Sequence, residues 1–393
     1  MGPRIAFRIF FVLVLIAASA LLGREARRAW RARTLPVTAV VTAMPSRDGV
    51  VGAPASSPPC GIDEETARRI FATLKGDTRA SRVRYDPFTV VTRDPDFDVE
   101  RIWPEHPHGR FHMRTNNLGL REDEPTLVEK PTGVVRVLVA GDSHTDGVVD
   151  NRDSFPNVLE RLLEDDPGVE GRRYEVLNAA VGSHGPGNYL GTLRKFLYLE
   201  PDLFVVALFV GNDFADAFQM RTWIHGISIE ASLEEDVSRL QAAAERWPDA
   251  IAQGLFQAHR FSCRPGWEKE VALEATLAYL LEARMLCLSR GIQLIVVTLP
   301  RKESVDEIAE EESTEQRRAL GLTKDEALCG ELLRDRLAAA LATLDFRLVD
   351  PSERMISEPA PCYWTQDYHL NLTGHRIVAE VLLPKVRELL GEQ

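Results

Sequence analysis

A serine, a histidine and an aspartate occupy positions from which they could carry out nucleophilic chemistry together. Ser143 stands in the turn Gly-Asp-Ser-His-Thr, directly after an apolar run that ends at Ala140. A serine hydroxyl is a weak nucleophile unless a base takes its proton and a third group orients that base. Asp367 and His369 are two positions apart, and in an extended loop such positions point to the same side. We therefore expect His369 to be the base for Ser143 and Asp367 to orient the imidazole ring.

Acyl transfer also needs hydrogen-bond donors for the oxyanion that forms in its tetrahedral intermediate. Asn212 follows one apolar run and could donate from its side-chain amide. Gly182 and Ser183 stand in a turn after another apolar run, and their backbone amides could donate as well. The candidate oxyanion hole therefore comprises these three residues together with the backbone amide of Ser143.

Short apolar runs alternate with helical patterns from residue 134 onward. Five runs suit strands that are buried on both faces, namely residues 134–140, 174–181, 203–210, 292–299 and 346–349. Helical patterns lie between and after them, at residues 155–163, 189–199, 267–290, 324–344 and 374–390. This alternation predicts an α/β fold, a three-layer α/β/α sandwich with a central parallel sheet. Ligands bind beyond the carboxyl ends of the strands in such sheets, where Ser143 and Asn212 are expected to meet.

The sequence from about Val134 to the end resembles the SGNH/GDSL hydrolases, a family named for catalytic Ser, Gly, Asn and His in four sequence blocks. The blocks match, in order, Gly141-Asp142-Ser143, the turn at Gly182 and Ser183, Gly211-Asn212-Asp213, and Asp367 with His369 and Asn371. Counted from Asn178, the oxyanion glycine of the family falls on Ser183. Only one residue separates Asp367 from His369, whereas the family usually has two. The segment over residues 114–121 also resembles one that often precedes the first block in bacterial members.

The resemblance implies a flavodoxin-like hydrolase fold and serine-dependent hydrolysis of an acyl ester by a Ser-His-Asp triad, with no cofactor and no metal. Water as the acceptor would make the protein an esterase, for instance one that removes O-acetyl groups from envelope carbohydrate or lipid. A sugar hydroxyl as the acceptor would make it an O-acyltransferase on a glycan. A non-catalytic glycan-binding or scaffold protein on a degenerate hydrolase fold is the alternative from a different class.

The composition excludes several other classes of protein. A hydrophobic fraction of 45% and a charged fraction of 27% are ordinary for a globular chain. A formal net charge of -12 makes nucleic acid an unsuitable partner. The five cysteines form no C-x-x-C pair, which argues against a structural zinc site. His106, His108 and His112 lack a carboxylate at a recognisable metal-binding spacing, so we expect them to pack or to lie at the surface.

The N-terminal 33 residues have the pattern of a membrane anchor. Arg4 and Arg8 precede an apolar run over residues 9–22, and an arginine-rich stretch over residues 24–33 follows without a convincing cleavage site. The pattern favours an uncleaved signal-anchor helix that crosses a bacterial inner membrane once. We expect the catalytic domain on the periplasmic side, although the basic residues on both flanks leave the orientation open.

Four segments follow from these patterns. Residues 1–33 are the anchor with its basic flank, and residues 34–62, rich in Pro, Ser, Ala and Val, are a flexible linker. Residues 63–133 are a small lead-in subdomain in which a helical pattern precedes short β-like pieces. Residues 134–393 are the hydrolase domain, with insertions near 214–263 and 301–323 that could be lids or solvated loops.

Overall fold

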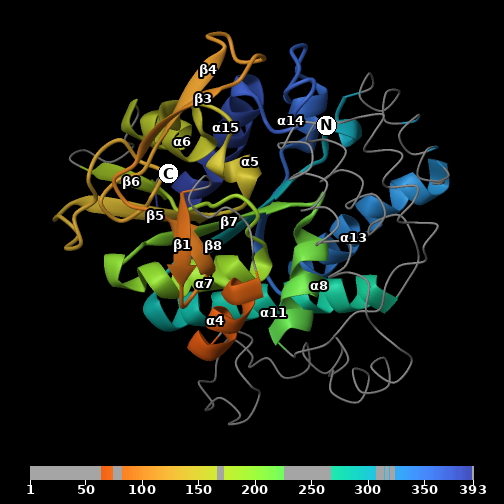
Figure 1. Cartoon of the computed structure of the whole chain (residues 1–393), viewed down its shortest axis with the longest axis horizontal. Coiled ribbons are helices and arrows are strands. Elements are labelled where there is room, and N and C mark those ends of the chain that lie inside the picture. The colour runs from red at the N-terminus through yellow and green to blue at the C-terminus, as the bar shows by residue number, and fades with distance from the viewer. Residues whose placement is uncertain are drawn as a thin grey trace.

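A parallel five-stranded sheet lies at the centre of the structure (Figure 1). The computed structural model describes residues 63–73, 82–165, 172–224, 267–306, 314, 318 and 324–391. The strands of the sheet are β5 (Val134–Ala140), β6 (Arg173–Asn178), β7 (Leu203–Phe209), β8 (Gln293–Leu299) and β9 (Arg347–Val349). Their spatial order is β6-β5-β7-β8-β9, so the chain reverses its direction of travel across the sheet at β5. Crevices for ligands form at the carboxyl ends of the strands beside such a reversal.

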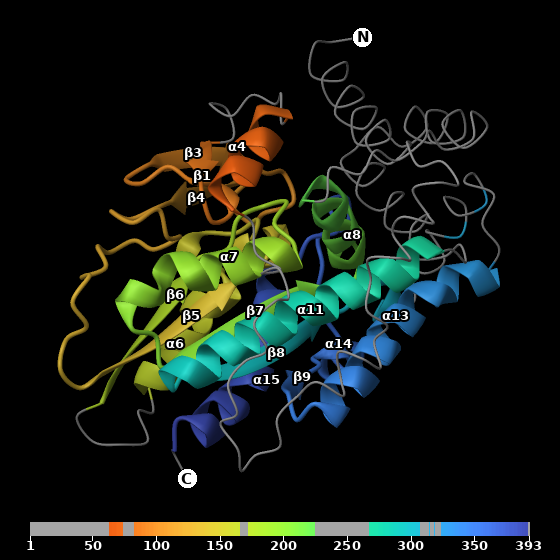
Figure 2. The same cartoon turned by 90° about the horizontal axis from the view of Figure 1, so that it is seen from below.

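Helices cover both faces of this sheet, which confirms the predicted three-layer α/β/α architecture (Figure 2). One face carries α7 (Pro186–Phe196), α8 (Asp213–Ile224), α11 (Trp267–Arg290) and α13 (Lys324–Thr343). The other face carries α6 (Phe155–Asp165), α14 (Ser352–Ile356) and α15 (Leu372–Leu389). Alternate residues of β5 enter the two cores, with Leu138 and Ala140 on the first side and Val137 and Val139 on the second. Burial on both faces explains why the strands read as continuous apolar runs.

The predicted elements of the sheet region agree with the observed ones to within a few residues. The largest difference at a strand end is at β6, which stops at Asn178 although the apolar run continues to Val181. The chain beyond Asn178 still follows β5, because the amides of Ala179 and Val181 donate to the carbonyls of Val139 and Gly141 over 2.9 and 3.2 Å. This irregular continuation brings the next turn beside the end of β5.

The lead-in segment packs against α7 and reaches the turn that follows β5. It comprises α4 (Glu64–Thr73) and two antiparallel hairpins, β1 (Val83–Asp86) with β2 (Val90–Arg93) and β3 (Asp98–Ile102) with β4 (Arg110–Arg114). Ala67, Ile70 and Val90 belong to the same buried cluster as α7 and α11. The second hairpin rests on a separate small cluster made by Phe97, Phe111 and Met113. The lead-in segment thus shares part of the main core.

Short helices complete the described chain: α5 (Ser143–Asp146) and the 3-10 turns η1 (Asn151–Asp153), η2 (Leu197–Leu199) and η3 (Lys302–Ser304). Cys287 and Cys362 are buried free thiols. None of the helices within the described ranges combines the length and hydropathy that a membrane span requires. The expected anchor and linker, and most of both insertions, lie outside those ranges.

Candidate active site

The turn after β5 exposes the hydroxyl of Ser143 and buries the residues on either side. Ser143 is the first residue of α5, and the Asp142 carboxylate caps this helix by accepting a 2.9 Å hydrogen bond from the His144 amide. A Cβ atom at Gly141 would lie 2.1 Å from the hydroxyl oxygen of Thr145, so the tight turn requires glycine there. Asp142 and His144 are buried whereas Ser143 is partly accessible. The side chain that can meet a substrate is therefore the serine.

The hydroxyl of Ser143 contacts His369, which in turn contacts Asp367. The distance from Ser143 Oγ to His369 Nε2 is 2.8 Å. His369 Nδ1 lies 2.5 Å from Asp367 Oδ2 and 3.0 Å from Oδ1. A carboxylate only accepts hydrogen bonds, so Nδ1 carries the proton and Nε2 is left to accept the serine proton. Burial alone would lower the pKa of His369, but the charge and hydrogen bond of Asp367 outweigh it and raise the pKa.

The loop that carries this pair is not extended, and the interpretation of an extended loop is wrong. Tyr368, between the two polar residues, has a φ of 65°, in the left-handed region. A bridge between Tyr363 and Leu370 closes the loop, and the Trp364 amide donates to the His369 carbonyl over 2.9 Å. With only one residue between the aspartate and the histidine, the left-handed turn allows the two side chains to meet.

The turn at Gly182 and Ser183 lies beside the nucleophile. A Cβ atom built on Gly182 would stand 3.7 Å from the Cβ of Ser143, so the backbone there passes close to the reacting group. Ser183 is exposed and has a φ of 69°. The His184 amide donates to the Val181 carbonyl over 3.1 Å and closes a four-residue turn with Ser183 in its third place. A positive φ at that place normally selects glycine, the residue that the family resemblance implies here.

Asn212 comes from the loop after β7, on the same edge of the sheet. Its side-chain nitrogen donates to Asp216 Oδ2 over 2.8 Å, so one of its two amide hydrogens is engaged. The neighbouring Asp213 is buried and accepts hydrogen bonds from the Tyr189 hydroxyl at 2.9 and 3.0 Å and from the Phe209 amide at 2.9 Å. Burial, with Asp142 and Asp216 nearby, raises the pKa of Asp213 well above its usual range. These contacts fix the loop that presents Asn212.

Comparison with known proteins gives matches among solved structures. No protein-family model and no curated protein matches the sequence. A GDSL-like lipase from Bacteroides thetaiotaomicron is 13% identical over 64% of this chain and 88% of its own, with a TM-score of 0.33. A catalytic mutant of an acetylxylan esterase from Geobacillus stearothermophilus is 15% identical over 64% of this chain and 94% of its own, with a TM-score of 0.37. The chain is similar to GDSL-type hydrolases.

Two histidines that flank this site are buried packing groups. His144 stacks on Phe209 with ring centroids 3.6 Å apart, and its ring lies 4.7 Å from that of His369. His184 lies 3.0 Å, through Nε2, from the Val91 carbonyl. Burial lowers the pKa of His144 well below its usual value and that of His184 to about 4. Both rings are therefore neutral near pH 7, and they support the walls of the site.

His375 is also structural. It is fully buried in the first turn of α15, and its Nδ1 accepts a 3.1 Å hydrogen bond from the Phe155 amide. Burial, with Arg121 and His369 nearby, lowers the pKa of His375 to about 3. The ring joins the start of α6 to α15 as a neutral group.

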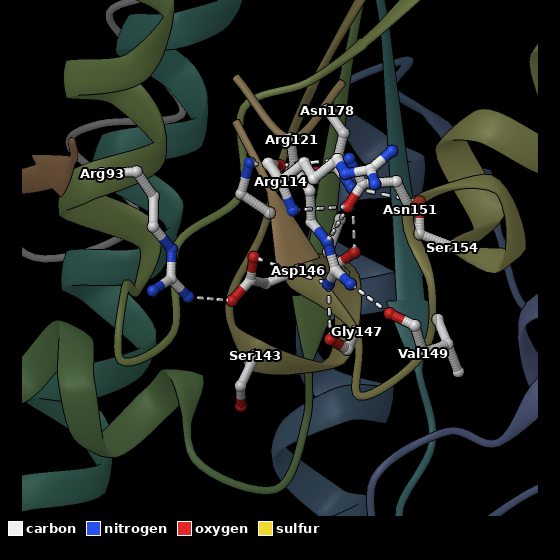
Figure 3. Close-up of polar contacts among 12 residues, drawn as sticks. Arg93, Arg114, Arg121, Ser143, Asp146, Gly147, Val149, Asn151, Ser154 and Asn178 are labelled. Atoms are coloured by element: carbon white, nitrogen blue, oxygen red, sulfur yellow. Dashed lines mark hydrogen bonds and ion pairs between the residues drawn. The ribbon is translucent and has the colours of Figure 1, made fainter. Parts of the chain in front are cut away.

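An arginine pair behind the nucleophile was not predicted from the sequence. Figure 3 shows Arg93 and Arg121 reaching Asp146, three residues after Ser143. Arg93 forms an ion pair with Asp146 Oδ2, and Arg121 Nη1 lies 3.7 Å from Oδ1. Arg121 also donates to the carbonyl of Gly147, and its burial lowers its pKa to about 10. Asp146 stands next to the predicted motif, but Arg93 lies 53 positions upstream and no local pattern singles it out.

The described residues contain no group of three His, Cys, Asp or Glu side chains that could hold a metal ion. His106 is buried near Trp364, with ring centroids 5.9 Å apart. His112 lies on β4, with its Nδ1 3.3 Å from Asp98. The first histidine thus packs and the second faces the surface, in agreement with the sequence interpretation.

Proposed function

We propose that the protein is a serine esterase of the SGNH/GDSL type. The observation that carries the proposal is the chain of contacts from Ser143 Oγ through the His369 imidazole to the Asp367 carboxylate, at 2.8 and 2.5 Å. A neutral imidazole whose Nδ1 proton is held by a carboxylate can take a proton at Nε2. The partly accessible hydroxyl at the carboxyl edge of the sheet is then the nucleophile.

In the proposed reaction, Ser143 Oγ bonds to the ester carbonyl carbon while its proton passes to His369 Nε2. The carbonyl electron pair moves to the oxygen, and Asp367 stabilises the imidazolium. Collapse of the intermediate breaks the bond to the alcohol, which takes the proton from Nε2. Water then attacks the acyl-serine with the same proton transfers and releases the acid. Donors for the oxyanion are the backbone amides near Ser143, Gly182 and Ser183 and the side chain of Asn212.

A fluorophosphonate probe tests this proposal directly, because it forms a stable bond only with an activated serine. Full-length protein is expected to be labelled, and Ser143→Ala and His369→Ala are expected to abolish labelling. Ser289→Ala and His112→Ala are matched controls, since both residues lie outside the site. A folded wild-type protein that is not labelled would favour the scaffold alternative.

We propose acetyl esters of envelope carbohydrate or lipid as the substrate class, with water as the acceptor. The proposal follows from the apolar run over residues 9–22, which would tether the domain to the inner membrane with the site on the periplasmic side. Incubation with an O-acetylated glycan, followed by mass spectrometry, separates the outcomes. Release of free acetate indicates an esterase, whereas appearance of the acetyl group on an added sugar indicates the O-acyltransferase. Fractionation of cells with and without residues 1–33 tests the tether.

A further inference from the structure

A carboxylate of the lead-in segment binds the backbone of the loop that carries Asp367. Glu105 lies between β3 and β4 and accepts hydrogen bonds from three consecutive amides. The amide of Thr365 donates over 2.5 Å, that of Gln366 over 3.0 and 3.1 Å to the two carboxylate oxygens, and that of Asp367 over 3.1 Å. Hydrogen bonds to an ionised acceptor are about twice as strong as those between neutral groups. The contact therefore fixes the chain at the residue that orients His369.

The loop that presents Glu105 is itself well held. The Trp103 amide donates to the Gly109 carbonyl over 2.9 Å, and the Gly109 amide donates to the His106 carbonyl over 2.7 Å. The Trp103 ring packs edge-on against Phe111 with centroids 6.1 Å apart. These contacts give the carboxylate a fixed position relative to the second hairpin.

A cation holds the same catalytic loop from the other side. The ammonium of the buried Lys302, in η3 after β8, donates to the Thr365 carbonyl over 3.1 Å. It also lies 4.2 Å from the centre of the Tyr368 ring. Glu105 thus binds the amide side of the loop, and Lys302 binds a carbonyl and the left-handed residue next to His369.

We propose that Glu105 is a positioning residue that holds Asp367 and His369 in the geometry needed to activate Ser143. The proposal rests on the esterase function proposed above. A shift of about 1 Å in a positioned group can cost roughly a hundredfold in rate, so a loop anchored at three amides has a direct kinetic consequence. The turn between β3 and β4 thus supports the proposed triad through Glu105.

The variant Glu105→Gln tests the proposal with little change in size. The glutamine amide has one acceptor oxygen, and its NH₂ group would face a donor amide of the loop. We expect kcat for p-nitrophenyl acetate to fall about tenfold or more while KM stays within about twofold. The groups that face His369 are Asp367, Asp142, Asp146 and the neutral His144. In Glu105→Gln the contact with Asp367, which raises the pKa of His369, would weaken. The acid limb of the pH profile is therefore expected to move to lower pH. A purely structural role for Glu105 would lower the active fraction without moving that limb.

Two further variants and one further measurement complete the test. Glu100→Gln, on the same hairpin, weakens only exposed contacts, with Arg110 and His112, and is expected to have wild-type kcat. Glu105→Asp keeps the charge on a shorter side chain, and its kcat is expected to lie between those of wild type and Glu105→Gln. Hydrogen exchange at the amides of Thr365 and Asp367 is expected to be at least about tenfold faster in Glu105→Gln, whatever the activity.

The outcomes separate the two proposals. Wild-type kcat, pH profile and amide protection in folded Glu105→Gln would overturn the positioning role, as would an equal loss of kcat in Glu100→Gln. Wild-type protein that neither hydrolyses the ester nor reacts with the fluorophosphonate would instead overturn the esterase proposal. In that case the exchange rates still decide whether Glu105 holds the loop.

Discussion

Replacement of Ser183 by glycine should stabilise the protein. Ser183 has a φ of 69° and is exposed, so the replacement removes little packing. The left-handed conformation costs an L-residue about 1–2 kcal/mol. Glycine avoids that cost but loses about 0.5–1 kcal/mol more through backbone entropy on folding. The difference predicts that Ser183→Gly raises the free energy of unfolding by roughly 0.5–1 kcal/mol.

Urea unfolding of wild type, Ser183→Gly and Ser183→Ala checks this value. The alanine variant is the control, because it removes the hydroxyl and keeps the unfavourable φ, so its stability should stay close to that of wild type. Ester hydrolysis should be within about twofold in all three, since a backbone amide would be the oxyanion donor. A glycine variant no more stable than wild type would refute the strain argument. An equal loss of activity in both variants would instead assign a role to the Ser183 hydroxyl.

Two further predictions concern histidines. The free energy of unfolding should fall as the pH drops from about 6.5 toward 3. His375 has a pKa of about 3 in the folded state, so the unfolded chain takes up the proton first. The expected contribution of His375 is up to roughly 1.4 kcal/mol per pH unit. His375→Gln should flatten this slope in urea titrations at a series of pH values, and an unchanged slope would show that other groups cause it. For catalysis, kcat/KM should rise with pH through a midpoint above 6.5, since the pKa of His369 is raised and its neutral form is the base. Asp367→Asn should lower both the plateau, by about a thousandfold or more, and this midpoint. A midpoint that does not move would show that Asp367 does not raise the pKa of the group that titrates.

The sheet could be predicted from the sequence because burial leaves a strong local signal. Strands covered by helices on both faces, such as β5 and β7, become continuous apolar runs whose ends are visible. The end of β6 was less clear, since residues beyond Asn178 remain buried while their hydrogen bonding becomes irregular. An apolar run in the sequence shows which residues are buried, but it shows only in part which of them have regular strand hydrogen bonding.

The side chains proposed to react could also be predicted, but their immediate surroundings could not. Ser143 and His369 have recognisable neighbours in sequence, and the structure places them within a hydrogen bond. The left-handed residue Tyr368 carries no such signal, because tyrosine rarely adopts that conformation and no glycine marks the turn. Burial of His144 likewise depends on Phe209, which comes from a different strand end.

Contacts between the lead-in segment and the catalytic loop show why a motif-based interpretation stops short of the working site. Glu105 is about 260 positions away from the amides it binds, and neither partner has an unusual local sequence. Arg93 and Asp146 meet in the same way behind the nucleophile. Family motifs record the groups that react, whereas the groups that hold them come from whichever segment covers the edge of the sheet. In this chain that segment is the lead-in, so a protein that begins at residue 134 would keep the predicted triad and lose the charged contacts made by Arg93, Glu105 and Arg121.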